Sequence, residues 1–269
     1  MKLSCASPMV PGSTLTEKAI HLKEWGYEGI ALFLDYREWN KDLKEEVLKL
    51  EARTGIQPCE FVFSDSVYGH LMDADPVKSV ACREMYKKAS EMAAELGAVT
   101  ELEFEYKAQD PLPCFDPFLQ PTPQEEEAFL RIYRELLKNL EGSGGKLLLE
   151  DINRYESRYY NRLSDCSRVV DLIDHPNAGI LADLFHMSIE EADMAAALME
   201  AGSRISHVHL GDNNRLLPGY GSTDFRKMFS VLKRNGYKGF INLECSTCGD
   251  PEKTLPGTAE YMKQILNEV

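Results

Sequence analysis

Short runs of apolar residues alternate along the chain with longer segments in which apolar residues recur at helical spacing. The apolar runs predict eight strands, at residues 2–6, 29–34, 56–63, 98–104, 146–151, 178–183, 205–210 and 239–244. Most of these runs are almost continuously apolar, as in "KLLLE" and "AGILA". That pattern is typical of parallel strands, because both faces of a parallel sheet are buried.

The segments between the strands predict helices, at residues 14–25, 41–54, 75–96, 122–139, 164–173, 188–201, 224–235 and 257–266. Thr14 and Glu17 have the spacing of a capping box, and Pro76 stands at a first helical position. Eight strand–helix units in 269 residues predict an α/β fold, a single (β/α)8 TIM barrel with residues 1–269 as one domain. A doubly wound open sheet is the alternative, but no Gly-x-Gly-x-x-Gly follows the first strand.

The overall negative charge makes nucleic acid an unfavourable binding partner. The chain has 44 acidic and 30 basic side chains, a net charge of −14, and its basic residues are scattered among acids. Such a surface repels nucleic acid. No stretch approaches ~18 apolar residues, so no membrane span is expected. The start lacks a long apolar segment and the seven cysteines form no framework, which favours a cytoplasmic protein with neither nucleic acid nor membrane as partner.

Polar side chains stand at the ends of the last four predicted strands. They are Glu150, Asp183, His209 and Glu244, about one per strand–helix unit. The carboxyl ends of barrel strands meet on one rim, so we expect these side chains to converge. Three carboxylates and one imidazole, without a thiolate, suit one divalent cation: Mn²⁺, Mg²⁺, Co²⁺ or Fe²⁺ are favoured, and Zn²⁺ stays open. A lone acid at a strand end is often only a helix cap, but four in matching positions favour a metal site.

The segments that carry these residues also resemble a known family. "LLLEDINRYES", "ILADLFHMSIEE", "HVHLGDNNRLLPGYG" and "GFINLEC" resemble the sugar isomerase/epimerase superfamily, whose barrel is like that of xylose isomerase. The pattern is most similar to ketose 3-epimerases and hydroxypyruvate isomerases. The resemblance covers residues 145–265, whereas the first half of the chain matches only in its strand–helix rhythm.

The resemblance implies roles for individual residues. Glu150, Asp183, His209 and Glu244 match the metal ligands, with Mn²⁺ as the first expectation. Glu150 and Glu244 also match the pair of catalytic carboxylates that face the substrate from opposite sides. The residues that match substrate-binding positions, which hold hydroxyl or carbonyl oxygens, are Glu156, His186 and Arg215. Relatives often form homodimers or homotetramers.

Taken together, the resemblance implies a divalent-metal-dependent isomerase or epimerase of a ketose or related hydroxy-carbonyl sugar. Such an enzyme abstracts a proton beside the carbonyl and passes through a metal-stabilised enediolate. Its oxygen-binding Arg215 lies in a Pro-Gly-x-Gly loop, where Asp212 is expected to orient His209 or Arg215. His207 lies one layer deeper on the same strand face and is expected to be a hydrogen-bonded core histidine.

Other functions stay open on the same scaffold. A lyase is the main alternative, either a dehydratase of a keto-inositol or keto-acid or a C-glycoside-cleaving subunit that acts on 3-keto sugars. A catalytically idle barrel that serves as a scaffold is another, although it would have no need of four ligands. DNA-repair endonucleases of related fold use extra histidines that the fourth strand, "TELEFEY", does not offer. Loops 64–73 and 107–121 match no relative, so they leave the substrate undefined.

Overall fold

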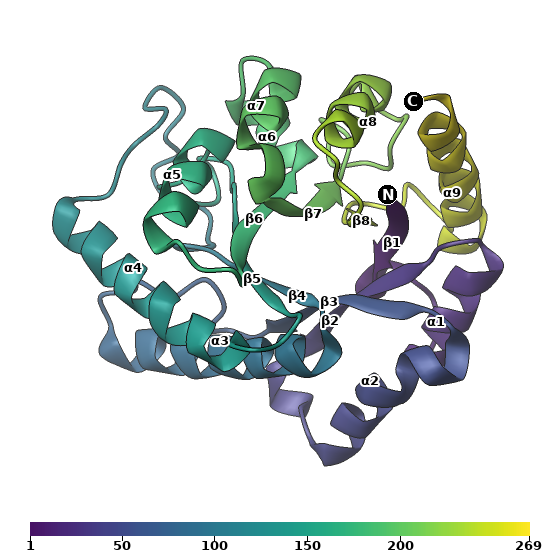
Figure 1. Cartoon of the computed structure of the whole chain (residues 1–269), viewed down its shortest axis with the longest axis horizontal. Coiled ribbons are helices and arrows are strands. Elements are labelled where there is room, and N and C mark those ends of the chain that lie inside the picture. The colour runs from purple at the N-terminus through teal and green to yellow at the C-terminus, as the bar shows by residue number, and fades with distance from the viewer.

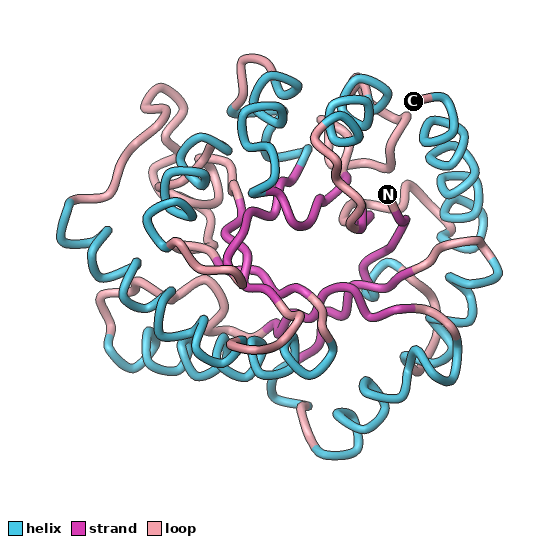
Figure 2. The backbone as a smooth tube through the Cα atoms, in the orientation of Figure 1, coloured by secondary structure: helices cyan, strands magenta, loops and turns pink.

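The computed structural model describes residues 1–269, and its strands form one closed parallel barrel in sequence order, which confirms the expected (β/α)8 TIM barrel (Figures 1 and 2). The strands are β1 (Lys2–Ala6), β2 (Gly29–Asp35), β3 (Gln57–Ser64), β4 (Val99–Leu102), β5 (Lys146–Glu150), β6 (Ala178–Asp183), β7 (Ile205–Leu210) and β8 (Phe240–Leu243). The barrel closes because β8 pairs in parallel with β1, with Leu3 opposite Ile241.

Helices surround the barrel on its outside (Figure 1). They are α1 (Leu15–Glu24), α2 (Lys41–Thr54), α3 (Pro76–Leu96), α4 (Pro123–Leu137), α5 (Leu163–Ile173), α6 (Leu184–Glu190), α7 (Met194–Ala201), α8 (Phe225–Arg234) and α9 (Pro251–Glu268). The expected capping box is present at α1, where the Glu17 backbone N–H donates to the Thr14 side chain. No helix is both long and apolar enough to cross a membrane.

Two predicted helices have different bounds in the structure. The helix expected at residues 188–201 is two helices, α6 and α7, each with its own aspartate cap. Asp183 accepts hydrogen bonds from the first turn of α6, directly after β6, and Asp193 caps α7. Helix α9 begins at Pro251 rather than near residue 257, because Asp250 supplies its cap and Pro256 lies inside the helix.

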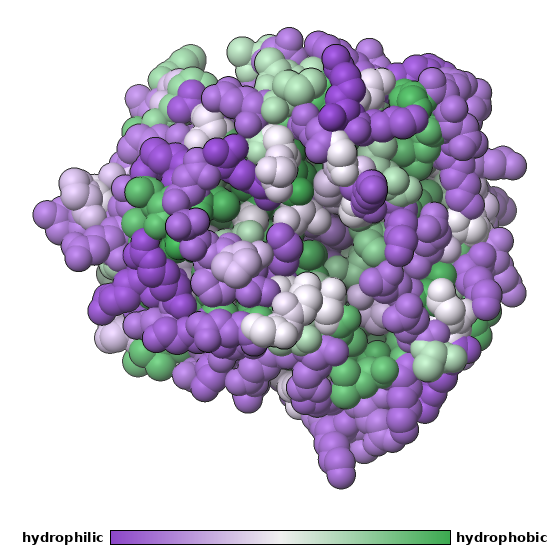
Figure 3. Space-filling model, viewed as in Figure 1, coloured by the Kyte–Doolittle hydropathy of each residue, from purple (hydrophilic) through white to green (hydrophobic).

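The strands bury two different sets of side chains. Residues that point outward, such as Leu147 and Val208, pack with the helices in an apolar core. The alternate residues point into the barrel, and several of these are polar, including Ser4, His207 and Asn242. Branched apolar residues usually fill the interior of such a barrel. The face seen in Figure 3 is mostly hydrophilic, with hydrophobic residues showing in patches between.

Candidate active site

The structure brings together the four side chains at the ends of the last four strands. Glu150 ends β5, Asp183 ends β6, His209 lies near the end of β7, and Glu244 directly follows β8. Asp183 and His209 are register partners of adjacent strands. One ligand atom from each of the four residues lies within 4.8 Å of the others. The parallel register therefore places all four groups at one height on the barrel rim.

Two atoms in this group have no hydrogen-bond partner within the protein. Asp183 uses Oδ1 to cap α6, accepting from the backbone N–H of Phe185 at 2.6 Å, and its buried Oδ2 is left unpaired. The His209 Nδ1 atom is also unpaired, although it lies 2.7 Å from Glu244 Oε2 and 3.7 Å from Glu150 Oε1. Carboxylate oxygens with one imidazole nitrogen suit a divalent cation of intermediate hardness. The donor set and its orphaned atoms fit such an ion.

The two glutamates of the group have opposite electrostatic settings. Burial raises the pKa of Glu150 to about 8. Burial also opposes ionisation of Glu244, but the adjacent His209 outweighs it and lowers the pKa of that carboxyl. Glu244 is the most exposed of the four, with 28% of its side chain accessible, whereas Asp183 and His209 are fully buried. Two carboxyl groups that differ in this way are suited to work as a proton donor and a proton acceptor.

The three residues expected to hold substrate oxygens form one chain of contacts beside this group. Asn153 links two of them: its amide donates to Glu156 Oε1 at 2.9 Å and to His186 Nδ1 at 2.6 Å. Asn153 and Arg215 both direct a donor at the ring of His186, toward Nδ1 and Nε2 respectively, and a neutral imidazole accepts at only one of these two atoms. That Nε2 lies 3.2 Å from Arg215 Nη1, and Arg215 Nη2 lies 3.6 Å from Glu244 Oε1.

Arg215 is held in place by an unusual loop backbone. Its φ of 57° is in the left-handed region, which non-glycine residues seldom adopt. Asp212 fixes this loop, because its carboxylate accepts backbone hydrogen bonds from Gly219, Gly221 and Thr223 at 2.8–3.0 Å. Asp212 therefore acts on Arg215 through the loop backbone, whereas the expectation that it orients His209 stays a prediction.

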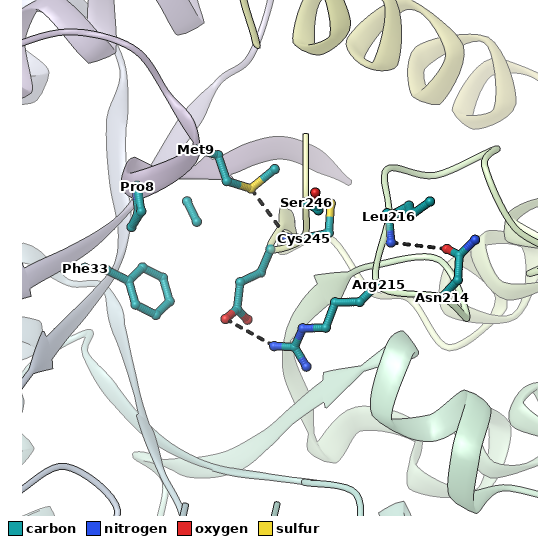
Figure 4. A pocket seen from close by; sticks show the side chains of 10 residues that line it. Pro8, Met9, Phe33, Asn214, Arg215, Leu216, Cys245 and Ser246 are labelled. Atoms are coloured by element: carbon teal, nitrogen blue, oxygen red, sulfur yellow. Dashed lines mark hydrogen bonds and ion pairs between the residues drawn. The ribbon is translucent and has the colours of Figure 1, made fainter. Parts of the chain in front are cut away.

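A cavity with two adjoining parts opens beside these groups, and Phe33, Arg215 and Glu244 line both parts. The inner lobe has a volume of about 210 Å³ and includes Glu150 and His186 in its wall. The outer lobe has a volume of about 420 Å³ and is lined further by Ala6, Pro8, Met9, Asn214, Leu216, Cys245 and Ser246. Figure 4 shows Arg215 reaching from its loop toward the side of the outer lobe that Phe33 and Pro8 form.

Sequence reasoning missed an acidic pair in the wall of the inner lobe. Glu101 and Glu103 come from the β4 region, and the Tyr68 hydroxyl lies within hydrogen-bonding distance of both carboxyl groups. Tyr86 donates a second hydrogen bond to Glu103. Burial raises the pKa of Glu103 to about 7, and burial together with the neighbouring Glu103 and Glu150 raises that of Glu101. The available signal was the alternation of acids with apolar residues in "TELEFEY", which places them on the barrel side.

A second missed residue lies deeper in the barrel. Glu60 of β3 is fully buried, and its Oε2 lies 2.9 Å from His209 Nε2 and 3.4 Å from His207 Nε2. Burial opposes ionisation of Glu60, but the two imidazoles outweigh it and lower the pKa of the carboxyl. His207 is a buried core histidine as expected, but its Nε2 has no hydrogen-bond partner in the protein. The signal for Glu60 was a lone acid inside the apolar run "IQPCEFVF".

Comparison with known proteins finds a matching family and similar sugar epimerases. The family described as xylose isomerase-like TIM barrel matches residues 20–265. An L-ribulose 3-epimerase of Methylomonas sp. (strain DH-1) is 30% identical over 206 residues, which cover 76% of this chain and 67% of that enzyme. A 3-dehydro-D-guloside 4-epimerase of Escherichia coli (strain K12) is 36% identical over 102 residues, which cover 38% of this chain and 39% of that enzyme.

The matches differ in how much of each relative they cover. The chain spans about two fifths of the length of the curated relatives that it matches at 35% identity or more. A solved structure of an L-ribulose 3-epimerase has a TM-score of 0.84 to this chain at 19% identity, and the match covers 99% of this chain and 95% of that one. At that identity the structural likeness concerns the fold alone.

Proposed function

The chain belongs to the xylose isomerase-like TIM barrel family, and from that premise we propose that it is a divalent-cation-dependent epimerase of a ketose or related hydroxy-carbonyl sugar. The observation that carries the proposal is the convergence of Glu150, Asp183, His209 and Glu244, with two orphaned atoms, at the wall of a cavity. The names of the relatives support the reaction type, since they are 3-epimerases and 4-epimerases of sugars.

Glu150, Asp183, His209 and Glu244 would hold the cation, with Mn²⁺ as the first expectation. A divalent cation bound there supplies Lewis acidity, which polarises the sugar carbonyl and stabilises the negative charge that develops on it. Asp183 and His209 are fully buried, so they serve as ligands only. Glu150 and Glu244 line the cavity and are able to reach the substrate as well.

Glu150 and Glu244 would move the proton. They come from β5 and β8, which are three strands apart around the eight-stranded barrel, so their carboxylates approach the cavity from different sides. One carboxylate removes the proton from the carbon beside the carbonyl and leaves an enediolate. The other returns a proton to the opposite face of that carbon, which inverts its configuration.

Arg215, His186 and Glu156 would hold the substrate. Arg215 and His186 both line the inner lobe, where the guanidinium donates to a carbonyl or hydroxyl oxygen of the substrate. Glu156 is an acceptor for a hydroxyl, and Asn153 fixes it relative to His186. This arrangement orients the reacting carbon between the two carboxylates.

A second candidate substrate class is a glycoside of a keto sugar, and the outer lobe favours it. This lobe continues past Arg215 and Glu244, has about twice the volume of the inner lobe, and includes Pro8, Met9 and Leu216 in its wall. A free ketose has no group that needs this apolar space, whereas an aglycone or a second sugar ring would contact it. The E. coli relative named a 3-dehydro-D-guloside 4-epimerase is in line with this class.

The proposal is tested with a panel of free ketoses and 3-keto-glycosides, incubated with Mn²⁺ in D₂O. We expect an epimer that carries solvent deuterium at the carbon beside the carbonyl, detected by NMR. Loss of water from the product, or release of an aglycone, would assign the site to a lyase instead. Absence of deuterium incorporation from every substrate in the panel would overturn the proposed reaction.

A further inference from the structure

The interior of the barrel beneath the four converging side chains is polar. Ser4 of β1, Glu60 of β3, His207 of β7 and Asn242 of β8 are all buried there, none with more than 1% of its surface accessible. Ser4 and Asn242 are register partners of adjacent strands, as are Asn242 and His209. Branched apolar residues usually fill this space, and a buried polar group destabilises the fold unless it has a partner. The buried polar side chains of this layer therefore need partners inside the barrel.

Within the layer, Glu60 makes the contact that bears on the site above. Its Oε2 lies 2.9 Å from Nε2 of His209, while the other ring nitrogen, Nδ1, faces Glu244 and Glu150. Glu60 is absent from the walls of both cavity lobes, so it meets neither substrate nor solvent. Whatever it does for the site passes through His209.

A neutral His209 ring carries its hydrogen on either Nδ1 or Nε2, and a carboxylate lies beside each of these atoms. The carboxylates of Glu244 and Glu150 would accept a hydrogen from Nδ1, and a hydrogen there would remove the lone pair that a cation needs. Glu60 offers a carboxylate on the opposite side of the ring, and an ionised carboxylate only accepts. When the ring is neutral, the 2.9 Å contact keeps the hydrogen on Nε2 and leaves the Nδ1 lone pair directed at the centre of the group.

We propose that Glu60 is a positioning residue that holds His209 in the tautomer and orientation in which Nδ1 binds the cation. The proposal rests on the cation site of the proposed function. It adds that the ligand set is prepared from inside the barrel, by a carboxylate that never touches the ion. Outer carboxylates of this kind typically fix the ring of a metal-bound histidine and raise its basicity.

The first test uses the wild-type protein labelled with ¹⁵N-histidine and titrated with Mg²⁺, which is diamagnetic. Long-range ¹H–¹⁵N spectra report which ring nitrogen of each histidine carries hydrogen, and His209 is assigned from a His209→Gln sample. We expect the Mg²⁺-bound protein to keep hydrogen on Nε2 of His209 and to show the cation-induced shift at Nδ1. Hydrogen on Nδ1, or a cation-induced shift at Nε2, would overturn the proposal.

The second test measures Mn²⁺ affinity without any sugar, from the electron paramagnetic resonance signal of free Mn²⁺. Glu60→Ala is expected to weaken binding by about 10–100-fold, the range found when an outer-shell partner is removed. Glu60→Gln should stay within a few-fold of the wild type, because its amide oxygen accepts the same hydrogen. Ser4→Ala is the matched control, since Ser4 lies in the same layer and has no hydrogen-bond partner there, and it should bind Mn²⁺ like the wild type.

The outcomes separate this proposal from its alternatives. Equal Mn²⁺ affinity in Glu60→Ala and the wild type would overturn it. Binding of a second Mn²⁺ by the wild type, lost in Glu60→Ala, would also overturn it, and would assign the nearby atoms of Glu60, His207 and His209 to another cation. If Glu60→Ala does not fold, the spectra of the wild type decide. Neither test includes a substrate, so the result stands whether or not a ketose proves to be epimerised.

Discussion

The two halves of the barrel contribute different chemistry to one cavity. Strands β5–β8 and the segments that follow them supply the four converging side chains, together with Arg215. Strands β1–β4 and their loops supply walls: Phe33, Tyr68 and the acidic pair of the β4 region. Under the proposed function, the second half supplies the groups that bind the cation and the carbonyl, which every keto sugar has. Under the same proposal, the first half lines much of the inner lobe around the rest of the sugar, and both halves line the outer lobe.

Removal of the cation is the most severe way to test this division, because every step proposed for the second half depends on it. Dialysis against a chelator should abolish turnover, and Mn²⁺ should restore it. Mn²⁺ should also stabilise the wild type against heat, by about 2.7 kcal/mol at a concentration 100 times its dissociation constant. Full activity after exhaustive chelation would contradict the proposed role of the second half, because that role depends on a bound cation.

Two matched variants localise that stabilisation. Asp183→Asn keeps an oxygen that caps α6, since asparagine is as good a cap as aspartate, but removes the charge from the converging group. It should lose most of the thermal shift caused by Mn²⁺. Asp193→Asn makes the same change at the cap of α7, away from the cavity, and should keep the shift. An equal shift in both variants would contradict the assigned site.

The carboxylate pair is the next largest test. Glu150→Gln and Glu244→Gln should each lower turnover by about 10²–10⁴-fold, the range typical of a lost general acid or base, and most of this loss should fall on kcat. Glu105→Gln is the control, because Glu105 is a buried acid that pairs with Arg158 at 2.7 Å and lines neither lobe. Full deuterium incorporation by either cavity variant would remove that residue from the proton transfer.

Arg215→Ala tests substrate binding in the same half. We expect KM to rise by about 10–100-fold with a smaller effect on kcat, because a hydrogen bond from a charged donor contributes about 1.5–3 kcal/mol. Arg204→Ala removes an arginine that pairs with Asp171 on the surface and should leave both constants unchanged. A fall in kcat alone would mean that Arg215 acts on the reaction and not on affinity.

More of the second half than of the first could be predicted from the sequence, and the structure explains why. The barrel itself was predictable, because eight apolar runs separated by amphipathic segments leave few other folds. Glu150, Asp183, His209 and Glu244 were predictable as a group, because parallel strands bring one residue per unit to the same rim. Their relation to the strand ends is periodic, and a periodic relation can be read from spacing alone.

The residues of the first half have no such regularity. Tyr68 reaches Glu101 and Glu103 from a loop, across a distance of more than 30 positions in the chain, and nothing local in the sequence indicates that contact. Glu60 contacts His209 through a single hydrogen bond between strands, and Asn153 of the second half contacts His186 in the same way. Such contacts depend on side-chain packing, which hydrophobic spacing does not determine. The start of α9 was misplaced by about one and a half turns, because Asp250 caps the helix and Pro256 lies inside it.

The smallest expected effect concerns the acidic pair of the first half. It tests whether these residues only line the cavity or take part in the proton transfer. Burial raises the pKa of Glu103 from its ordinary 4.5 to about 7, so the folded protein holds a proton there that the unfolded chain releases. Wild-type stability should therefore fall as the pH rises through the interval between those values, and stay lower above it. Glu103→Gln cannot ionise, so its melting temperature should fall less than that of the wild type between about pH 5 and about pH 8, by about 2–4 °C for each kcal/mol involved.

Glu105→Gln again serves as the control and should keep the wild-type pH dependence. If Glu103 belongs to the wall, Glu103→Gln should also change kcat for deuterium exchange by less than 10-fold, well short of the loss from the carboxylate pair. A loss as large as that of Glu150→Gln would place Glu103 in the proton transfer. The chemistry would then extend into the first half, because the Glu103 carboxylate lies within reach of Glu150, and the division between the two halves would no longer hold.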